Sequence, residues 1–380
     1  MDLVAGRAWA DERRPIRHLD PVLLIVTGAL SLIGLLSIYS ASHASLVSLG
    51  ADPMYYVKKQ VAALVLGVLL LLVIATFDYR FFKVYAGFIY AASVLLLVLV
   101  RIPGIGSSAN GAQRWFQFAG FQLTPSEFAK IALIVMLAAM LSELRTPEPT
   151  FGDLLRVCVV AGVPMLLVLI QPDIGTTIVL TAIVVGVLVV AGTRPRQLVV
   201  LALMAVVLIA LAFQLGVVQR YQIARLTGFL DPQNSSDTTN YNRQQSEIAV
   251  GSGGLFGRGY LNGTQTNLNY VPEQHTDFIF TVVGEEFGFL GAIFVLALFA
   301  ILIWRAIRIS YLSKDPFGTY VAAGVASMFA IQMFVNVGMV IGIMPITGIP
   351  LPFVSYGGTA MLANFVGVGL LLNVHMRRFK

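Results

Sequence analysis

Ten apolar runs divide this chain, and each is long enough to cross, or nearly cross, the hydrocarbon core of a bilayer. They cover residues 22–42, 57–77, 82–101, 125–142, 154–170, 174–192, 197–217, 286–304, 318–342 and 357–374. A membrane-spanning helix needs about 20 mostly apolar residues. Charged residues form only 12% of the chain, about half the share found in soluble domains. The sequence therefore predicts an all-α polytopic membrane protein with about ten transmembrane helices, and it argues against a disordered chain, a nucleic-acid-binding domain or an ordinary cytosolic enzyme.

The positive charges predict the orientation of these helices. Ten spans that begin in the cytoplasm place both termini on the cytoplasmic side. Most of the 25 lysine and arginine residues then fall on inner segments: Arg7, Arg13, Arg14, Arg17, Arg80, Lys83, Arg145, Arg156, Arg194, Arg196, Arg305, Arg308, Lys314, Arg377, Arg378 and Lys380. Cytoplasmic loops of membrane proteins carry such an excess. The net charge of +6 therefore indicates membrane orientation, and no nucleic-acid partner is needed to explain it.

The loops define the domain organisation. Residues 1–20 are too charged for a signal peptide and form a cytoplasmic N-terminal arm, while 21–380 form a single transmembrane domain. Two outer loops are long, 102–124 and 218–276, and the second is an extracytoplasmic loop between helices 7 and 8. A structureless loop of that size is usually functional. The spacing of apolar residues predicts a short surface helix over 220–230. Cys158 is the only cysteine, which excludes an intramolecular disulfide.

The strongest cluster of titratable residues lies where the second long loop meets the eighth span. It contains Glu273, His275, Asp277, Glu285 and Glu286. A helix beginning near Thr276 would place Asp277, Thr281, Gly284 and Gly288 on one face. Asp277 or Thr276 could then cap that helix. Five titratable groups at a membrane entrance also favour a functional site, because charge is costly in lipid and needs a reason.

Three other motifs carry polar residues close to the outer face. Thr124 and Glu127 have the spacing of a capping box, and Pro125 suits the first helical position; Glu127 could equally pair with Lys130, a cation that needs a partner inside the fourth span. In the QPDIGTT turn, Asp173 could cap the next helix. Three prolines over 345–352 exclude regular helix and predict an irregular segment lining a cavity, after which Ser355 could cap the last helix.

Several outer-face arginines are candidates for phosphate binding, since the guanidinium fork suits phosphate oxygens. Arg114 lies beside Trp115 in the first long loop, and an aromatic ring suits either a sugar face or the headgroup belt. The second long loop contributes Arg220, Arg225, Arg243 and Arg258. For each of these residues, anchoring at the membrane interface is the competing structural interpretation.

The motifs together resemble the SEDS family (shape, elongation, division and sporulation proteins). The resemblance covers residues 20–378 and rests on PSEFAK at 125–130, QPDIGT at 171–176, PEQHTDFIFTVVGEE at 272–286 and PLPFVSYGGT at 350–359. Residues 259–278, GYLNGTQTNLNYVPEQHTDF, look more like the RodA-like, cell-elongation branch than the FtsW-like, division branch. The resemblance implies a plasma-membrane peptidoglycan glycosyltransferase whose active site faces outward. Its implied substrate is lipid II, an undecaprenyl-pyrophosphate-linked disaccharide-pentapeptide.

The resemblance also implies roles for particular residues. Asp277 matches the essential aspartate of the family, Glu127 and Lys130 its acid–lysine pair, Asp173 its QPD aspartate and Ser355 its SYGGT serine. The implied partners are a class B penicillin-binding protein and the elongation machinery.

The chemistry of such a polymerisation agrees with these assignments. A carboxylate base would activate the acceptor hydroxyl, and a single inversion would give the β linkage. Arginines, or a divalent cation such as Mg²⁺ or Mn²⁺, would neutralise the pyrophosphate; no organic cofactor is implied. The alternative is a lipid II flippase, for which the broken outer segment and the Glu127–Lys130 pair would also be suitable. The gathering of polar groups at one face favours the enzyme.

Overall fold

The computed structural model describes residues 19–104, 106–109, 112–118, 121–144, 148–214 and 237–378. Its helices are α2 (Pro21–Ser48), α3 (Tyr55–Thr76), α4 (Tyr79–Val84), α5 (Ala86–Leu99), α6 (Pro125–Ser142), α7 (Phe151–Ile170), α8 (Ile174–Val190), α9 (Pro195–Gln214), α11 (Asp237–Ser252), α12 (Thr264–Asn267), α13 (Ile279–Tyr311), α14 (Pro316–Val340) and α15 (Gly358–Arg377). Its strands are β1 (Ser107–Ala109), β2 (Ala112–Phe118) and β3 (Phe121–Leu123).

The predicted helical membrane class is confirmed. In the described part of the chain, seven helices are long and apolar enough to cross a membrane, and three shorter apolar helices lie at other predicted spans. The predicted third span, 82–101, is broken into α4 and α5. The predicted eighth span, 286–304, is the middle of the longer helix α13, which is kinked at Gly288, where φ is 66°. The positive φ suits glycine, which has no Cβ to clash.

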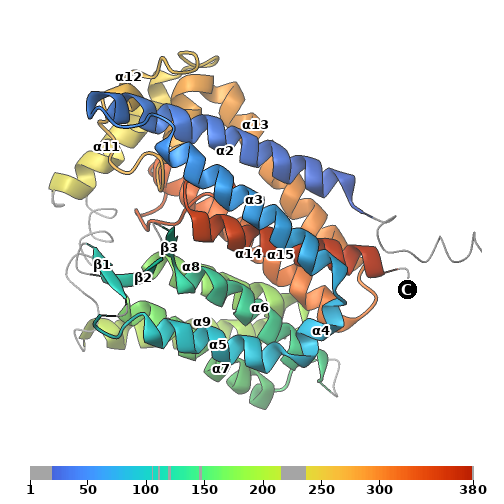
Figure 1. Ribbon diagram of the computed structural model, residues 1–380. Coiled ribbons are helices and arrows are strands. Elements are labelled where there is room, and N and C mark those ends of the chain that lie inside the picture. The colour runs from blue at the N-terminus through green and yellow to red at the C-terminus, as the bar shows by residue number, and fades with distance from the viewer. Residues whose placement is uncertain are drawn as a thin grey trace, which may run out of the picture.

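The helices form a bundle with the two described chain ends at one end of it (Figure 1). The other end holds α11, α12 and a small antiparallel sheet in the order β1-β2-β3. This sheet lies in the first long loop and was not predicted, because β1 and β3 have three residues each and the sequence of β2, AQRWFQF, does not alternate strictly between apolar and polar residues. The predicted surface helix over 220–230 and most of the arm over 1–20 lie outside the described residues.

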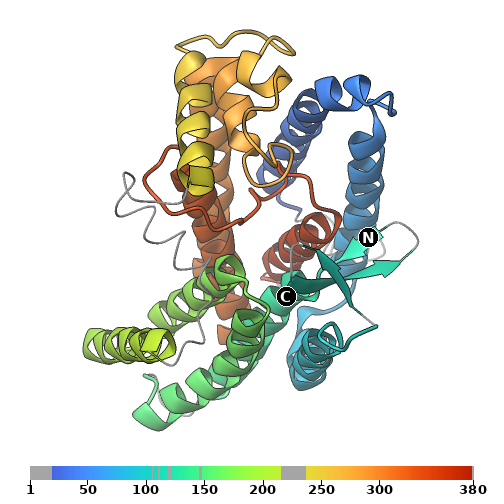
Figure 2. The same cartoon turned by 90° about the vertical axis from the view of Figure 1, so that its left-hand side faces the viewer.

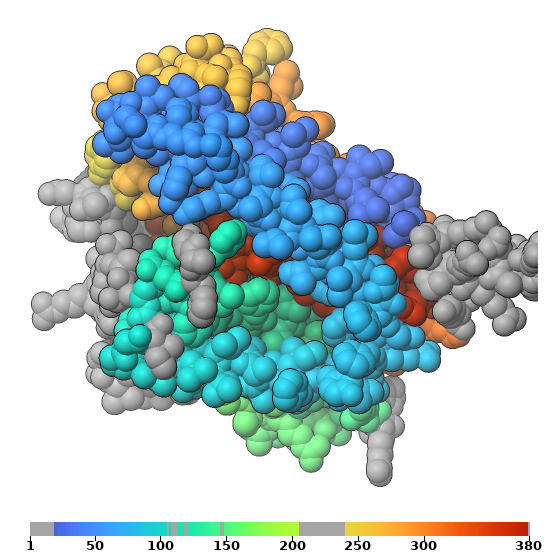
Figure 3. Space-filling view, in the orientation of Figure 1, coloured from blue at the N-terminus to red at the C-terminus, as the bar shows by residue number. Residues whose placement is uncertain are grey.

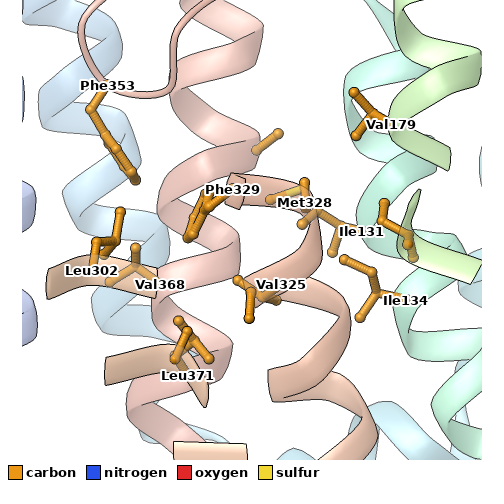
Figure 4. Packing of buried hydrophobic residues seen from close by; sticks show 14 of the residues in the cluster. Ile131, Ile134, Val179, Leu302, Val325, Met328, Phe329, Phe353, Val368 and Leu371 are labelled. Carbon is orange, nitrogen blue, oxygen red and sulfur yellow. The ribbon is translucent and has the colours of Figure 1, made fainter. Parts of the chain in front are cut away.

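Three helices form the interior. In the apolar stretches of α6, α14 and α15, 78%, 72% and 83% of the residues are buried, against 28% in each of α3, α7 and α13. The exposed helices have apolar outer surfaces, which lipid would cover. Figure 4 shows how the three interior helices pack, with Met328 and Phe329 of α14 between Ile131 of α6 and Val368 of α15. The interior of the protein is therefore helix on helix, and polar groups within it require partners.

Candidate active site

An irregular segment between α14 and α15, residues 341–357, is where the separated motifs meet. Seen from the end that carries the sheet, this segment crosses the middle of the bundle (Figure 2). Most of its second half is buried, including Leu351 and Phe353. The predicted irregular backbone is confirmed here. We name residues 341–357 the central segment; it contains most of the PLPFVSYGGT motif, and residues of the QPDIGT and PEQHTDF motifs contact it.

Asp277 lies against this central segment. A Cβ added to Gly348 would be 3.1 Å from Oδ2 of Asp277, so the carboxylate sits directly beside the glycine. Gly348 also has a φ of 72°, a left-handed conformation that favours glycine. The side-chain amide of Asn336 in α14 donates hydrogen bonds to the backbone oxygens of Asp277 (2.8 Å) and Ile349 (2.7 Å). Asn336 thus joins the aspartate to the central segment.

Asp277 is not the N-cap residue of α13, and the helix begins three residues later than the start near Thr276 considered above. The helix begins at Ile279, its N-cap is Phe278, and the cap makes no side-chain hydrogen bond. The preceding residues form a turn in which the backbone oxygen of Glu273 accepts hydrogen bonds from the N–H groups of Thr276 (3.2 Å) and Phe278 (3.3 Å). Asp277 is therefore a half-buried carboxylate outside the helix.

Asp173 caps α8, as the structural interpretation predicted. Its Oδ1 accepts a hydrogen bond from the N–H of Thr176 at 2.9 Å, and its Oδ2 accepts one from the Thr176 hydroxyl at 2.8 Å. The same turn contacts the central segment: a Cβ on Gly175 would be 2.8 Å from the backbone oxygen of Thr347. Thr347 precedes Gly348, so the QPD turn and Asp277 reach adjacent residues.

Arg114 positions the QPD turn. It extends from β2, and its Nε donates a hydrogen bond to the backbone oxygen of Gln171 at 2.7 Å; a terminal nitrogen donates to that of Pro172. Arg114 was a candidate for phosphate binding from the sequence. Its contacts in the structure give it a second, structural role, which is to hold the QPD turn. Trp115, the next residue in β2, is half-buried, and its backbone oxygen accepts a hydrogen bond from the Ser107 hydroxyl at 3.0 Å.

Ser355 closes a turn within the central segment and does not cap the last helix. Its hydroxyl accepts a hydrogen bond from the N–H of Leu351 at 2.8 Å, and the N-cap of α15 is Gly357. The buried Gln60 of α3 donates to the backbone oxygen of Ser355 and accepts from the N–H of Gly357, both at 3.1 Å. Ser355 therefore supports the shape of the segment.

His275 also joins the central segment. Its backbone oxygen accepts a hydrogen bond from the N–H of Tyr356 at 2.9 Å. Its ring lies 4.5 Å from the ring of Tyr56 and 5.6 Å from that of Tyr356, measured between centroids. Burial lowers the pKa of His275, and the negative charge of Glu273 partly opposes that shift. Burial raises the pKa of Tyr356 to about 12. The rings of His275 and Tyr356 are therefore both neutral at neutral pH.

Glu127 and Lys130 form a buried ion pair at the start of α6, with Nζ and Oε2 2.7 Å apart and both side chains almost fully buried. The predicted pair is confirmed. The predicted capping box is wrong, because Thr124 makes no side-chain cap hydrogen bond. The N–H of Thr124 instead donates to the hydroxyl of Thr359 at 3.2 Å, which ties the start of α6 to the start of α15.

Glu285 and Glu286 belong to the fold and not to the meeting point of the motifs. Both are buried. The Glu285 carboxylate accepts hydrogen bonds from the N–H groups of Gln265 (2.8 Å) and Thr266 (2.9 Å) and from the Thr266 hydroxyl (2.7 Å). Glu286 accepts hydrogen bonds from the Ser40 hydroxyl and from the N–H of Leu261. The predicted cluster of five titratable groups is therefore divided between two regions.

Of the remaining candidates, Arg243 reaches the central segment and Arg258 does not. Arg243 pairs with Glu247 at 2.8 Å, and a Cβ on Gly342 would be 3.2 Å from its Nε. Arg258 donates hydrogen bonds to the backbone oxygen of Ser252 and the hydroxyl of Thr264, which holds it within the loop before α12. Glu273 is exposed and closes the turn described above. Arg220 and Arg225 lie outside the described residues.

The described residues offer no dedicated metal site, since nowhere among them do three His, Cys, Asp or Glu side chains gather closely enough to hold an ion. Sequence reasoning missed Asn336 and Gln60, two buried amides that fix the site. Asn336 lies four residues after Gln332 within the mostly apolar run 318–342, and Gln60 follows Lys58 and Lys59 at the start of the run 57–77. A polar side chain inside such a run needs a partner in the bundle, so this signal could have identified both.

The fold and the site define a class: polytopic helical membrane proteins whose polar site is built on an irregular segment before the last helix. The chain belongs to the cell cycle protein family of FtsW, RodA and SpoVE, whose sequence profile matches residues 21–380. This confirms the family resemblance drawn from the four motifs.

Two curated relatives and one solved structure illustrate the similarity. The chain is 37% identical to a probable peptidoglycan glycosyltransferase FtsW of Geobacter metallireducens, over 96% of each protein. It is 36% identical to the peptidoglycan glycosyltransferase MrdB of Escherichia coli K12, over 95% of this chain and 94% of that protein. A chain of a solved peptidoglycan synthase complex is 30% identical, with a TM-score of 0.80, over 95% of this chain and 99% of that one.

Proposed function

We propose that this protein is a peptidoglycan glycosyltransferase that polymerises lipid II into glycan strands at the outer face of the bacterial plasma membrane. Relatives that match nearly the full length carry the name peptidoglycan glycosyltransferase. The observation that carries the proposal is the position of Asp277. Its carboxylate lies beside Gly348, next to residues reached by the QPD turn, and it precedes the N-cap residue of α13.

In the proposed reaction, Asp277 is the general base. Its carboxylate takes the proton of the 4-hydroxyl of the acceptor GlcNAc as that oxygen bonds to the anomeric carbon of the donor strand. The bond from this carbon to the pyrophosphate oxygen breaks, and the lipid pyrophosphate leaves with the bonding electrons. Attack from the opposite face inverts an α linkage to a β linkage in one step, so one base is sufficient. Such proton transfer typically contributes about 10²–10⁴-fold.

The leaving pyrophosphate requires positive charge. Two described arginines are candidates to supply it: Arg243, which pairs with Glu247 beside Gly342, and Arg114, which binds the QPD turn. A divalent cation such as Mg²⁺ or Mn²⁺, if bound, would take its oxygen ligands mainly from the substrate, because the described side chains form no three-residue acidic or histidine cluster. We assign no step of the reaction to it.

The site also needs a path for a polyprenyl tail that stays in lipid. In the space-filling view, residues of α15 are visible between α3 and the β-sheet (Figure 3). Since α3 has an apolar, exposed outer surface, a lipid tail could lie there while its headgroup reaches the central segment. This opening supports a lipid-linked substrate.

The proposal includes a partner and a branch of the family. The solved complex that this chain resembles is described as coordinating polymerization and crosslinking, which supports a class B penicillin-binding protein as the partner. The identities to an FtsW and to MrdB are nearly equal, so they do not distinguish division from elongation. The sequence over 259–278 favours elongation, which complementation of a strain lacking its elongation polymerase would test.

The decisive experiment uses purified protein and lipid II in liposomes, with and without the penicillin-binding protein. The wild-type protein should make glycan strands and Asp277→Asn should not, although it keeps partner binding. The same liposomes can report movement of labelled lipid II between leaflets. Movement without polymerisation by the wild-type protein, unaffected by Asp277→Asn, would replace the enzyme with a flippase.

A further inference from the structure

We propose a second binding site at the end of the bundle opposite the central segment, with the phosphate of an anionic lipid headgroup as its ligand. A pocket of about 100 Å³ lies there between the start of α2 and the ends of α13 and α15. Its polar lining consists of Asp20, Arg305, Arg308, His375 and Arg378. Figure 1 shows the start of α2 and the end of α15 at this end of the molecule, which the charge distribution predicts to face the cytoplasm.

The lining is positively charged even after its internal ion pair is counted. Asp20 is fully buried, and its Oδ1 accepts a hydrogen bond from the N–H of Leu23 at 3.2 Å, which caps α2. Its Oδ2 accepts hydrogen bonds from Arg305, one of them from Nε at 2.8 Å. Three arginines against one aspartate leave an excess of two positive charges in the lining.

The behaviour of Arg378 agrees with this excess. Burial lowers the pKa of its guanidinium, the charges of Arg308 and Arg305 lower it further, and Asp20 opposes them. A bound anion would relieve this repulsion. Cations often lie near helix C-termini, where they complement the helix dipole, and inner loops carry positive charge in general. Neither tendency requires three guanidinium groups from two helices to surround one hollow.

The surroundings of the pocket indicate a lipid headgroup as the source of the phosphate. The ring of Trp304 lies 5.6 Å from the Arg305 guanidinium and 5.4 Å from that of Arg308. Trp304 and Tyr311 on the same helix are 53% and 87% exposed. Tryptophan and tyrosine prefer the depth of the headgroups, so the pocket opens at that depth. Basic pockets between helices on the cytoplasmic side are typical sites for anionic lipids.

The test is a lipid titration of the purified full-length protein in detergent, read by native mass spectrometry. The probes are phosphatidylglycerol, phosphatidylcholine with the same acyl chains, and inorganic phosphate as a competitor. We expect one phosphatidylglycerol to bind more tightly than any phosphatidylcholine and to resist displacement by equimolar phosphate. Each arginine near an anionic lipid contributes about fivefold, so Arg308→Gln with Arg378→Gln should weaken this binding by about 25-fold.

The matched control is Arg156→Gln with Arg196→Gln, which removes two exposed arginines from other helices at the same end. It should change the affinity by about twofold at most, because these residues do not line the pocket. Equal binding of phosphatidylglycerol and phosphatidylcholine by the wild-type protein would overturn the proposal without any variant. Displacement by equimolar phosphate would overturn the lipid source, and unchanged affinity in the double pocket variant would overturn the location.

Discussion

The motif over 272–286 contains two buried carboxylates, Glu285 and Glu286, and a half-buried one, Asp277, and their contacts differ. Glu285 and Glu286 are buried within α13, and their oxygens accept hydrogen bonds from residues 261–266 and from Ser40. Asp277, eight residues before Glu285, is half-buried, lies outside the helix and contacts the central segment. The comparison teaches that acidic residues at a membrane entrance divide into two that hold the outer loop and one that lies at the candidate site.

Among the charged groups that hold the fold, the buried Glu127–Lys130 ion pair should give the largest loss of stability when it is broken. Changing Lys130 to Met strands the Glu127 carboxylate, and removal of one partner of a buried pair costs about 3–5 kcal/mol. Thermal unfolding in detergent measures the loss. The double variant Glu127→Gln, Lys130→Met is the control and should recover most of the stability. A fully stable Lys130→Met protein would show that the pair does not hold α6 in place.

Glu285→Gln should have the next largest effect. The carboxylate accepts three hydrogen bonds from Gln265 and Thr266, and an amide cannot replace both oxygens as acceptors. We expect a loss of about 2–3 kcal/mol, with faster proteolysis in residues 253–268. Glu273→Gln, at an exposed position, is the control and should leave the unfolding temperature unchanged. If both variants were equally stable, Glu285 would not be structural.

Asn336→Leu should have a smaller effect on stability and a clear effect on activity. It removes the donors to the backbone oxygens of Asp277 and Ile349, which should cost about 1–3 kcal/mol. Displacing a reacting group by about 1 Å can reduce a rate by about 10²-fold, so polymerisation should fall although the protein folds. Gln332→Leu, one turn away and also buried, is the control. Equal activity of the two variants would remove the positioning role of Asn336.

The smallest effect should be a pH dependence from His275. Burial lowers its pKa below the usual value of about 6.5, so the unfolded chain binds this proton more readily than the folded chain does. Its contribution to stability is therefore full above pH 6.5 and is lost as the pH falls through the lower, folded pKa. The unfolding temperature of His275→Gln should fall less than that of the wild type over this range. If the unfolding temperatures of the two proteins fell in parallel with pH, His275 would not be the source of the pH dependence.

The sequence predicted the fold better than the geometry of the site. Most span positions follow from local hydrophobicity, and the Asp173 cap depends on residues three positions apart, so these were predicted correctly, although the third span is broken into α4 and α5. The start of α13 was not, because Glu273 closes a turn there with a φ of 51°, and Asn336 binds the Asp277 carbonyl from 59 residues away. The partners of Glu285 lie about 20 residues earlier in the chain. Such distant contacts leave no periodic pattern in the sequence.

The most direct test of the central claim measures activity and stability together for Asp277→Asn and Glu285→Gln. We predict that Asp277→Asn unfolds at the wild-type temperature, binds the penicillin-binding protein and polymerises lipid II at least about 10²-fold more slowly. For Glu285→Gln we predict the opposite: a clear fall in unfolding temperature and a smaller change in the polymerisation rate per folded protein. An Asp277→Asn protein that makes glycan strands at the wild-type rate, or whose loss of activity follows an equal loss of stability, would contradict the assignment of Asp277 as the base.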